Sequence, residues 1–147
     1  MILPPKMLEA FKAVDFIIHA GDIADESVLK VLRAIKPVKA VQGNVDDENL
    51  RKKLPLRELF EVEGIRIGVY HGHGSGKNAL ANAQAQFKND PVDIVIFGHS
   101  HQPMNEKIGP TVFFNPGSPN DACRAPYFSY GRLEVSKGQL KPAIIKL

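Results

Sequence analysis

The stretch DIVIFGHSH at residues 93–101 carries the clearest signal of the fold. After Asp93 come four apolar residues, which predict a short strand that is buried on both faces. A glycine and two histidines follow at once, so His99 and His101 should lie beyond the carboxyl end of this strand. Open α/β sheets place their ligand sites at that edge. The stretch therefore predicts an α/β protein with a site at the ends of its strands.

The same arrangement recurs upstream in the chain. Three more polar groups follow apolar runs: Asp22 after residues 16–20, Asn44 after residues 38–41, and His71 and His73 after residues 65–70. Histidines two positions apart on an extended segment point the same way, so we expect both members of each pair to face the site. Imidazole nitrogens suit Zn, Fe, Ni and Mn, while carboxylate and amide oxygens favour Mn or Mg. These residues together predict a metal site.

Other polar residues near these motifs have more ordinary interpretations. Asp22 and Asn44, taken singly, would be turn residues. His19 lies inside a strand and is expected to be a buried, hydrogen-bonded structural residue, with support of a metal ligand as the less favoured role. Asp46 fits either a helix cap or a carboxylate that supports the ligands. Lys77 and Arg124 could contact phosphate, but solvated surface charge is the more typical role.

Composition excludes several classes of protein. The 147 residues predict a single domain over 1–147, and a net charge of +3 without a basic stripe gives no sign of nucleic-acid binding. The sequence shows neither an apolar run long enough to cross a bilayer nor a secretion signal, so no membrane association is expected. One cysteine, Cys123, excludes an internal disulfide and favours a cytoplasmic protein. We expect Cys123 to be a small buried residue.

The apolar pattern predicts alternating helices and strands, followed by a β-rich half. Helices are expected at residues 6–13, from a cap at Asp25 to Pro37, in a short segment whose first turn is residues 46–48, and at 79–87. Strands are expected at residues 16–20, 38–41, 59–63, 65–70, 93–97, 112–114, 127–135 and 140–145. Glu63-Gly64 signals a hairpin. An α/β fold with two packed mixed sheets and helices outside them follows.

With these motifs in order, the chain resembles the calcineurin-like metallophosphoesterases, in particular their small YfcE-type phosphodiesterase branch. The family pattern is D-x-H, G-D, G-N-x-D, H and G-H-x-H. The matching segments are Gly21-Asp22, Gly43-Asn44-Val45-Asp46, His71, Gly98-His99-Ser100-His101 and the late loop Asn115-Pro116-Gly117-Ser118. The resemblance covers essentially the whole chain and implies a four-layer αββα fold.

The resemblance also implies roles for the site residues. Asp22 would bridge two divalent metal ions, Asn44, His71 and His99 would hold one ion, and His101 would help to hold the other. Asp22, Asn44 and His71 would be catalytic, and Asn44 and His73 would contact the substrate. The expected metal is Mn, with Fe, Zn or Ni as alternatives. The implied activity is hydrolysis of a small-molecule phosphate ester, specifically a phosphodiester, by water that the two ions activate.

Two departures from the family pattern matter. Val45 stands where many phosphoesterases have histidine, which the YfcE-type branch tolerates. No D-x-H pair precedes the first helix, so we expect the first strand of the fold to be absent and activity to be impaired. An open slot between buried strands invites pairing with another chain, which predicts a homo-oligomer. The alternative to an enzyme is a non-catalytic scaffold of the same fold, similar to the retromer subunit.

Overall fold

The computed structural model describes residues 3–147, which form four helices and nine strands. The helices are α1 (Pro5–Phe11), α2 (Glu26–Ile35), α3 (Glu48–Lys53) and α4 (Ala79–Gln86). The strands are β1 (Ile17–His19), β2 (Val38–Ala40), β3 (Arg57–Val62), β4 (Ile65–Tyr70), β5 (Ile94–Ile96), β6 (Met104–Ile108), β7 (Thr111–Asn115), β8 (Ser129–Ser136) and β9 (Gln139–Lys146). The expectation that no strand precedes the first helix falls partly on residues 1 and 2, which lie outside the described range.

The strands form one large sheet and two smaller ones. The five-stranded sheet has the order β3-β4-β5-β7-β6, with β5 parallel to both of its neighbours. β1 and β2 form a parallel pair, and β8 and β9 form an antiparallel hairpin. Among residues 3–147, β1 is hydrogen-bonded to β2 alone, so its other edge carries no strand. The large sheet is therefore mixed, as the sequence predicts.

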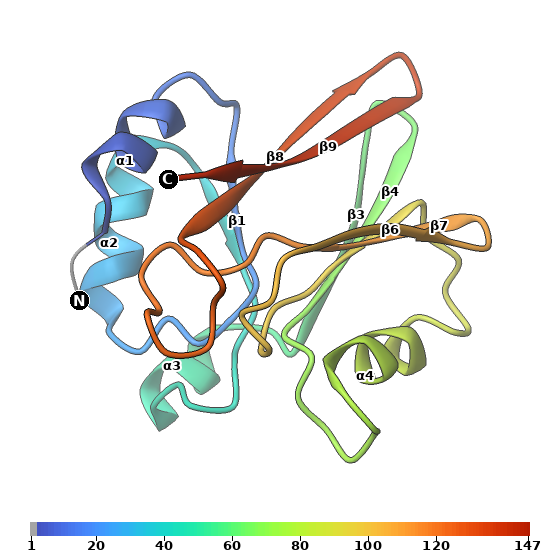
Figure 1. The fold of residues 1–147 in the computed structure, drawn as a ribbon, viewed down its shortest axis with the longest axis horizontal. Helices are drawn as coiled ribbons and strands as arrows, with labels where there is room; N and C mark the ends of the chain where they lie inside the picture. The colour runs from blue at the N-terminus through green and yellow to red at the C-terminus, as the bar shows by residue number, and fades with distance from the viewer. Residues whose placement is uncertain (1–2) are drawn as a thin grey trace.

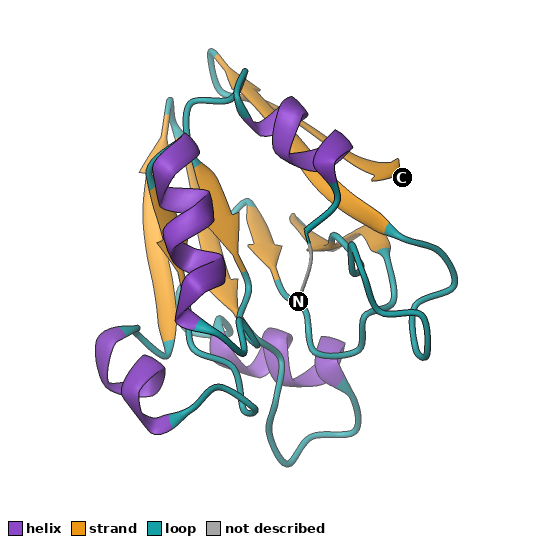
Figure 2. Ribbon diagram, turned by 90° about the vertical axis from the view of Figure 1, so that its left-hand side faces the viewer, coloured by secondary structure: helices purple, strands orange, loops and turns teal. Residues whose placement is uncertain are grey.

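The elements stack in layers, as Figures 1 and 2 show. α1 and α2 pack on one side with β1 and β2, and α4 covers the far face of the five-stranded sheet. Between them lies an apolar core that joins β4 and β5 to residues of β1, β8 and β9. Ile94 and Val95 of β5 are completely buried, and each such side chain contributes about 1.5–3 kcal/mol. This order of layers is the expected αββα arrangement.

Local sequence explains where α2 and α3 begin and why the strand β6 is not predicted. The Asp25 side chain accepts a hydrogen bond from the amide of Ser27 and caps α2, as predicted. Asp47, rather than Asp46, caps α3 by accepting from the amide of Leu50 at 2.8 Å. β6 was not predicted because its residues are largely polar and exposed, which hides the alternation typical of a strand.

The topology brings several strand ends to one place. β4 and β5 run parallel, as do β1 and β2, so the loops of each pair emerge at one edge; the contacts of His71 with Ala20 and Asn44 bring the two edges together. Asp22, Asn44, His71 and His99 lie in those loops. The predicted hairpin at Glu63-Gly64 joins β3 to β4 and is confirmed.

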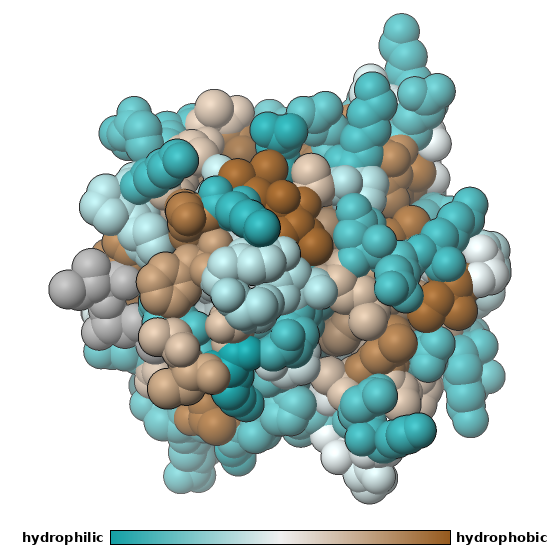
Figure 3. Space-filling model, in the orientation of Figure 1, coloured by the Kyte–Doolittle hydropathy of each residue, from teal (hydrophilic) through white to brown (hydrophobic). Residues whose placement is uncertain are grey.

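Polar side chains dominate the face shown in Figure 3, with separate apolar areas among them.

Across residues 3–147, none of the helices has both the length and the apolar character that crossing a membrane requires.

Candidate metal centre

Four side chains converge where the strands end. The Asp22 carboxylate Oδ2 lies 3.0 Å from Nε2 of His71. The amide oxygen Oδ1 of Asn44 lies 3.0 Å from the same nitrogen and 3.1 Å from Nδ1 of His99. The two histidine nitrogens are 3.2 Å apart. The predicted convergence of Asp22, Asn44, His71 and His99 is thus present in the structure.

Glycines let the loops approach closely enough for this arrangement. A Cβ atom on Gly43 would lie 2.1 Å from Oδ1 of Asp22, and one on Gly21 would lie 2.7 Å from Nδ1 of His71. Asp22 itself has a positive φ of 57°, a conformation that costs a non-glycine residue on the order of 1 kcal/mol. Its Oδ1 accepts a hydrogen bond from the amide of Val45, which holds the strained residue in place.

Asp46 ties two of these loops together. Its carboxylate is almost fully buried and accepts hydrogen bonds from the amides of Ala24, at 2.9 Å, and Gly43, at 2.8 Å. The alternative of a helix cap is therefore wrong for Asp46, because Asp47 fills that position. Asp46 instead fixes the loop after β1 against the loop after β2, and so sets the separation of Asp22 and Asn44.

The donor atoms of the cluster fit a cation. Nδ1 of His71 lies 2.8 Å from the carbonyl oxygen of Ala20, which can only accept, so Nδ1 carries the proton and the lone pair of Nε2 faces Asp22 and Asn44. Three acceptor atoms about 3 Å apart repel one another unless a proton or a metal ion lies among them. In an octahedral site with bonds of about 2.1 Å, neighbouring ligand atoms are about 3.0 Å apart. The observed 3.0–3.2 Å separations match that spacing.

The protonation states of Asp22 and His99 favour binding of a cation by the cluster. Burial by itself would raise the pKa of Asp22, but its contacts with His71 and with the amide of Val45 outweigh that effect and hold the pKa below the usual value. Burial, together with the neighbouring His71, lowers the pKa of His99. Asp22 is therefore ionised at neutral pH, and His99 favours the neutral form that binds metals.

The two histidines of residues 98–101 do not point the same way, contrary to expectation. His99 and His101 have φ values of 66° and 60°, so the segment coils instead of extending. His99 joins Asn44 and His71, whereas Nδ1 of His101 contacts the Asp121 carboxylate. His101 is outside the tight group of Asp22, His71 and His99. The period-two argument fails here because it holds only for extended backbone.

His73 lies beside the cluster without joining it. Gly72, with a φ of 112°, turns the chain between the two histidines, and the ring of His73 stacks on Tyr70 with centroids 5.3 Å apart. Its centroid is 5.5 Å from that of His71. Nδ1 of His73 is buried without a hydrogen-bond partner among residues 3–147. Burial and the nearby His71 lower the pKa of His73 and favour the neutral ring.

His73 also lines a recess of about 290 Å³ next to the cluster, together with Tyr70, Asn82 and Gln86. Asn82 shapes this recess, since it accepts from the amide of Gly76 and donates to the carbonyl of Gly72.

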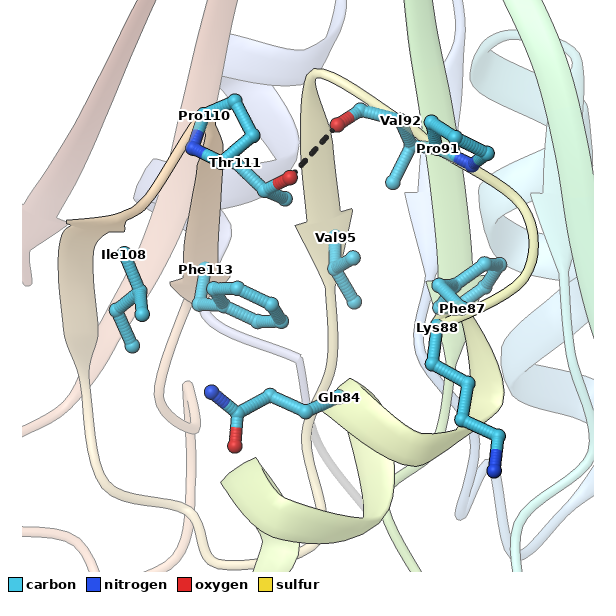
Figure 4. Close-up of a pocket in the computed structure, with 10 residues that line it drawn as sticks. All are labelled: Gln84, Phe87, Lys88, Pro91, Val92, Val95, Ile108, Pro110, Thr111 and Phe113. Atoms are coloured by element: carbon cyan, nitrogen blue, oxygen red, sulfur yellow. Dashed lines mark hydrogen bonds between the residues drawn. The ribbon is translucent and has the colours of Figure 1, made fainter.

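A different hollow is larger but lies away from the histidines. Figure 4 shows this groove of about 340 Å³ between α4 and the ends of β5, β6 and β7, lined mainly by apolar side chains such as Phe87, Val95 and Phe113. Its lining includes Lys88 but no histidine or carboxylate, so it lacks the groups that would hold a metal ion. We therefore assign the chemistry to the cluster and not to the larger groove.

Within residues 115–124, Asn115 and Asp121 make contacts that the sequence does not predict. The fully buried Asn115 donates to the carbonyl of Gly98 and to Oγ of Ser100, so it fixes the loop that carries His99. Asp121 contacts His101. The Asn115-Pro116-Gly117-Ser118 segment signalled a loop, but no pattern in the sequence indicated that Asp121 would meet a histidine twenty residues away.

The structure agrees with the expected roles of two further residues and corrects those of two others. Nδ1 of His19 accepts a hydrogen bond from the amide of Gly21 at 3.1 Å, which agrees with a structural role. Cys123 is exposed, so its expected burial is wrong, because it lies in a surface loop instead of the core. Arg124 contacts Asp121 and His101 and is thus a paired charge, not a purely solvated one. Lys77 is exposed, as expected.

Comparison with known proteins agrees with this geometry. Residues 1–138 match the calcineurin-like phosphoesterase superfamily domain. The chain belongs to this superfamily. A probable metallophosphoesterase of Methanocaldococcus jannaschii is 36% identical over 134 residues, which cover 90% of this chain and 67% of that protein. Phosphodiesterase YfcE of Escherichia coli is 32% identical over 102 residues, covering 66% of this chain and 52% of that protein.

Solved structures show the same fold. Vps29 of Chaetomium thermophilum superposes with a TM-score of 0.81, covering 100% of this chain and 87% of that one at 20% identity. At this level of identity the likeness shows the fold alone. The expected family and its αββα fold are therefore confirmed, and the YfcE-type phosphodiesterases are among the relatives.

Proposed function

We propose that this metallophosphoesterase-family chain is a phosphodiesterase that uses a divalent metal centre. The observation that carries the proposal is the convergence of Asp22, Asn44, His71 and His99, whose acceptor atoms lie 3.0–3.2 Å from one another. Holding such a group of acceptors together without a cation among them costs free energy. The phosphodiesterase named among the relatives supports the type of ester.

Each residue has a proposed part in the reaction. The metal ions, when bound, would polarise the phosphoryl oxygens and activate water. Asp22 would bridge the two ions, with Asn44, His71 and His99 on one ion and His101 on the other. The Ala20 carbonyl orients His71, and Asn115 fixes the loop of His99. Both contacts reduce the reorganisation that binding would otherwise require.

Asn44 and His73 are the proposed substrate contacts. His73 lines the recess, and its burial favours the neutral ring, whose single N–H can donate a hydrogen bond to an ester oxygen of a small molecule held there. The chemistry of the donor set favours Mn, since two oxygens and two imidazoles suit a metal of intermediate hardness. The single cysteine supports a cytoplasmic location.

The test combines metal content with activity. Wild type purified with Mn should hold a transition metal and hydrolyse an aryl phosphodiester. His99→Ala and Asn44→Ala should lower both, by at least the ~10–100-fold that loss of a supporting group costs at metal sites. Asn105→Ala, which removes an exposed amide that contacts Pro142 far from the cluster, is the matched control and should behave as wild type.

The second candidate function is a non-catalytic scaffold, for which the fold shared with Vps29 provides a suitable framework. Tight metal binding by wild type without hydrolysis of any aryl phosphate ester would support the scaffold and overturn the enzyme. Absence of metal from wild type and variants alike would overturn the metal centre itself.

A further inference from the structure

The guanidinium of Arg51 lies against the loop that carries Asn44. Its Nη2 donates a hydrogen bond to the main-chain carbonyl of Asn44, whose side-chain oxygen belongs to the cluster. Covalent geometry limits these two oxygens of one asparagine to about 5 Å apart, so Nη2 lies within about 8 Å of the side-chain oxygen. None of the motifs identified in the sequence includes Arg51.

Helix α3 fixes the place from which this side chain extends. Asp47 caps the helix through the amide of Leu50, and the amide of Arg51 donates to the carbonyl of Asp47 at 3.0 Å. The side chain of Gln42, in the loop after β2, donates to the Arg51 carbonyl at 3.2 Å. The backbone of Arg51 is therefore tied to the segment that carries Asn44.

Arg51 differs from the two other cations in the last turn of α3. Lys52 and Lys53 each form an ion pair with a glutamate, with N–O distances of 3.3 Å and 2.6 Å. Within residues 3–147, no carboxylate forms an ion pair with Arg51. A guanidinium has several N–H donors in a fixed fork, and the contact with Asn44 uses one of them. The charge and the other donors are exposed and available to a ligand.

The charge of Arg51 also acts on His73. After burial and His71, which lower the pKa of His73 most, the positive charge of Arg51 lowers it further. The guanidinium thus lies near Asn44 and His73, the two residues proposed to contact the substrate. Val45, the next residue along the loop, is apolar and 63% exposed, so its side chain offers a ligand no hydrogen bond. Arg51 therefore supplies a cationic donor on this side of the site.

An unpaired cation beside a metal centre favours anions. Its charge repels metal ions and so does not help to hold them, but it attracts an anion that approaches the same site. In the proposed reaction the metal ions contact the phosphoryl oxygens of the diester. A second anionic group, one short carbon chain away, would meet the guanidinium, whose fork matches the geometry of a carboxylate or a phosphate.

We infer that Arg51 determines substrate specificity: it binds an additional anionic group, a carboxylate or a phosphate, on one alcohol of the phosphodiester. The inference rests on the proposed phosphodiesterase and names the class of diester that it prefers. The alternative is that Arg51 only holds the loop of Asn44. Loss of the side chain would then disturb the metal centre, whereas anion binding predicts that the metal centre stays intact.

Steady-state kinetics of the Mn-loaded full chain separate the two roles. The substrates are p-nitrophenyl phosphodiesters whose second alcohol ends in a carboxylate, a phosphate or a methyl group. Arg51→Met should raise KM for the two anionic substrates by about 5–10-fold, between the effect of an exposed ion pair and that of a buried charged hydrogen bond. The larger of the two effects identifies the anionic group. KM for the methyl-ended substrate should equal that of wild type, and Arg51→Lys, which keeps the charge, should have the smaller effect.

Binding without turnover provides an independent readout. 3-Phosphonopropanoate and butylphosphonate share a phosphonate that hydrolysis does not remove, and only the first carries a carboxylate. In calorimetric titration of the Mn-loaded protein, wild type should bind the first about 5–10-fold more tightly, and Arg51→Met should lose this preference. Titration of the metal-free proteins with Mn should give the same affinity for both. Lys52→Met removes a positive charge from the same turn of α3 and is the matched control, which should behave as wild type in every assay.

The inference is overturned if Arg51→Met raises KM for the methyl-ended substrate as much as for the anionic ones, or if wild type shows no preference for 3-phosphonopropanoate. It is also overturned if Arg51→Met binds Mn more weakly than wild type, because Arg51 would then hold the loop of Asn44. These outcomes are distinct from failure of the proposed function. A wild type that binds with the expected preference but hydrolyses no phosphodiester would retain the role of Arg51 and reject the enzyme.

Discussion

Substitution of Gly43 by alanine tests whether close packing of the loops builds the metal centre. The added Cβ would lie 2.1 Å from Oδ1 and 2.2 Å from the amide nitrogen of Asp22, whereas ordinary contact begins at 3.4 Å. One of the two loops must therefore move by more than 1 Å. Neither can do so freely, because Asp46 hydrogen-bonds to both.

The expected cost follows from this clash. Overpacking of a rigid site costs about 1–3 kcal/mol and occasionally more, and the upper end applies here because the obstructing atoms include backbone. For a chain of this size, 3 kcal/mol lowers the unfolding temperature by roughly 6–12 °C. The movement should also separate Asp22 from Asn44 and His71, so Mn binding should weaken together with stability.

Gly98→Ala is the matched control. Gly98 also borders the site, but its added Cβ would meet nothing closer than 3.6 Å, and its φ is not in the positive range. Thermal unfolding of the metal-free proteins by circular dichroism and calorimetric titration with Mn provide the comparison. If Gly43→Ala unfolds at the same temperature as Gly98→Ala and binds Mn equally well, the loops are not closely packed and the reasoning is refuted.

Two further predictions concern pH and assembly. Burial lowers the pKa of His19 from 6.5 to about 4, although the negative charges of Asp46 and Asp22 act to raise it. Between pH 6.5 and pH 4, His19 therefore takes up a proton in the unfolded chain but not in the folded chain. The free energy of unfolding of the metal-free protein should therefore fall from pH 6.5 to pH 4, by at most about 3 kcal/mol from this residue. His19→Asn keeps an acceptor for Gly21 and should flatten the dependence in chemical denaturation, while an unchanged slope would contradict the assignment. The second edge of β1 has no partner strand among residues 3–147, so we expect the chain to self-associate there. Sedimentation should show a mass that rises with protein concentration, and the amide of Ile18, which points away from β2, should exchange more slowly at high concentration than at low concentration. A monomer at all concentrations with the same exchange rate would refute the prediction.

The sequence was sufficient for the parts of the fold that depend on local patterns. Apolar runs located eight of the strands, and Asp25 and Glu63-Gly64 located a helix start and a hairpin, because capping and turn geometry involve residues close in the chain. β6 was missed because its exposed polar residues carry no alternation. The position of Asp22, Asn44, His71 and His99 followed from one rule, that parallel strands end at a common edge.

What the sequence by itself determined is which side chains follow the strands and that they suit a metal ion. The tertiary structure decided which of them meet. Positive φ values at residues 99 and 101 send His101 away from His99 and toward Asp121, and burial places Asp46 between two loops instead of at a helix start. These contacts join residues about twenty positions apart through loop conformations that no periodic pattern encodes. Backbone coiling and close approach at Gly21 and Gly43, rather than residue type, therefore set the final geometry of the site.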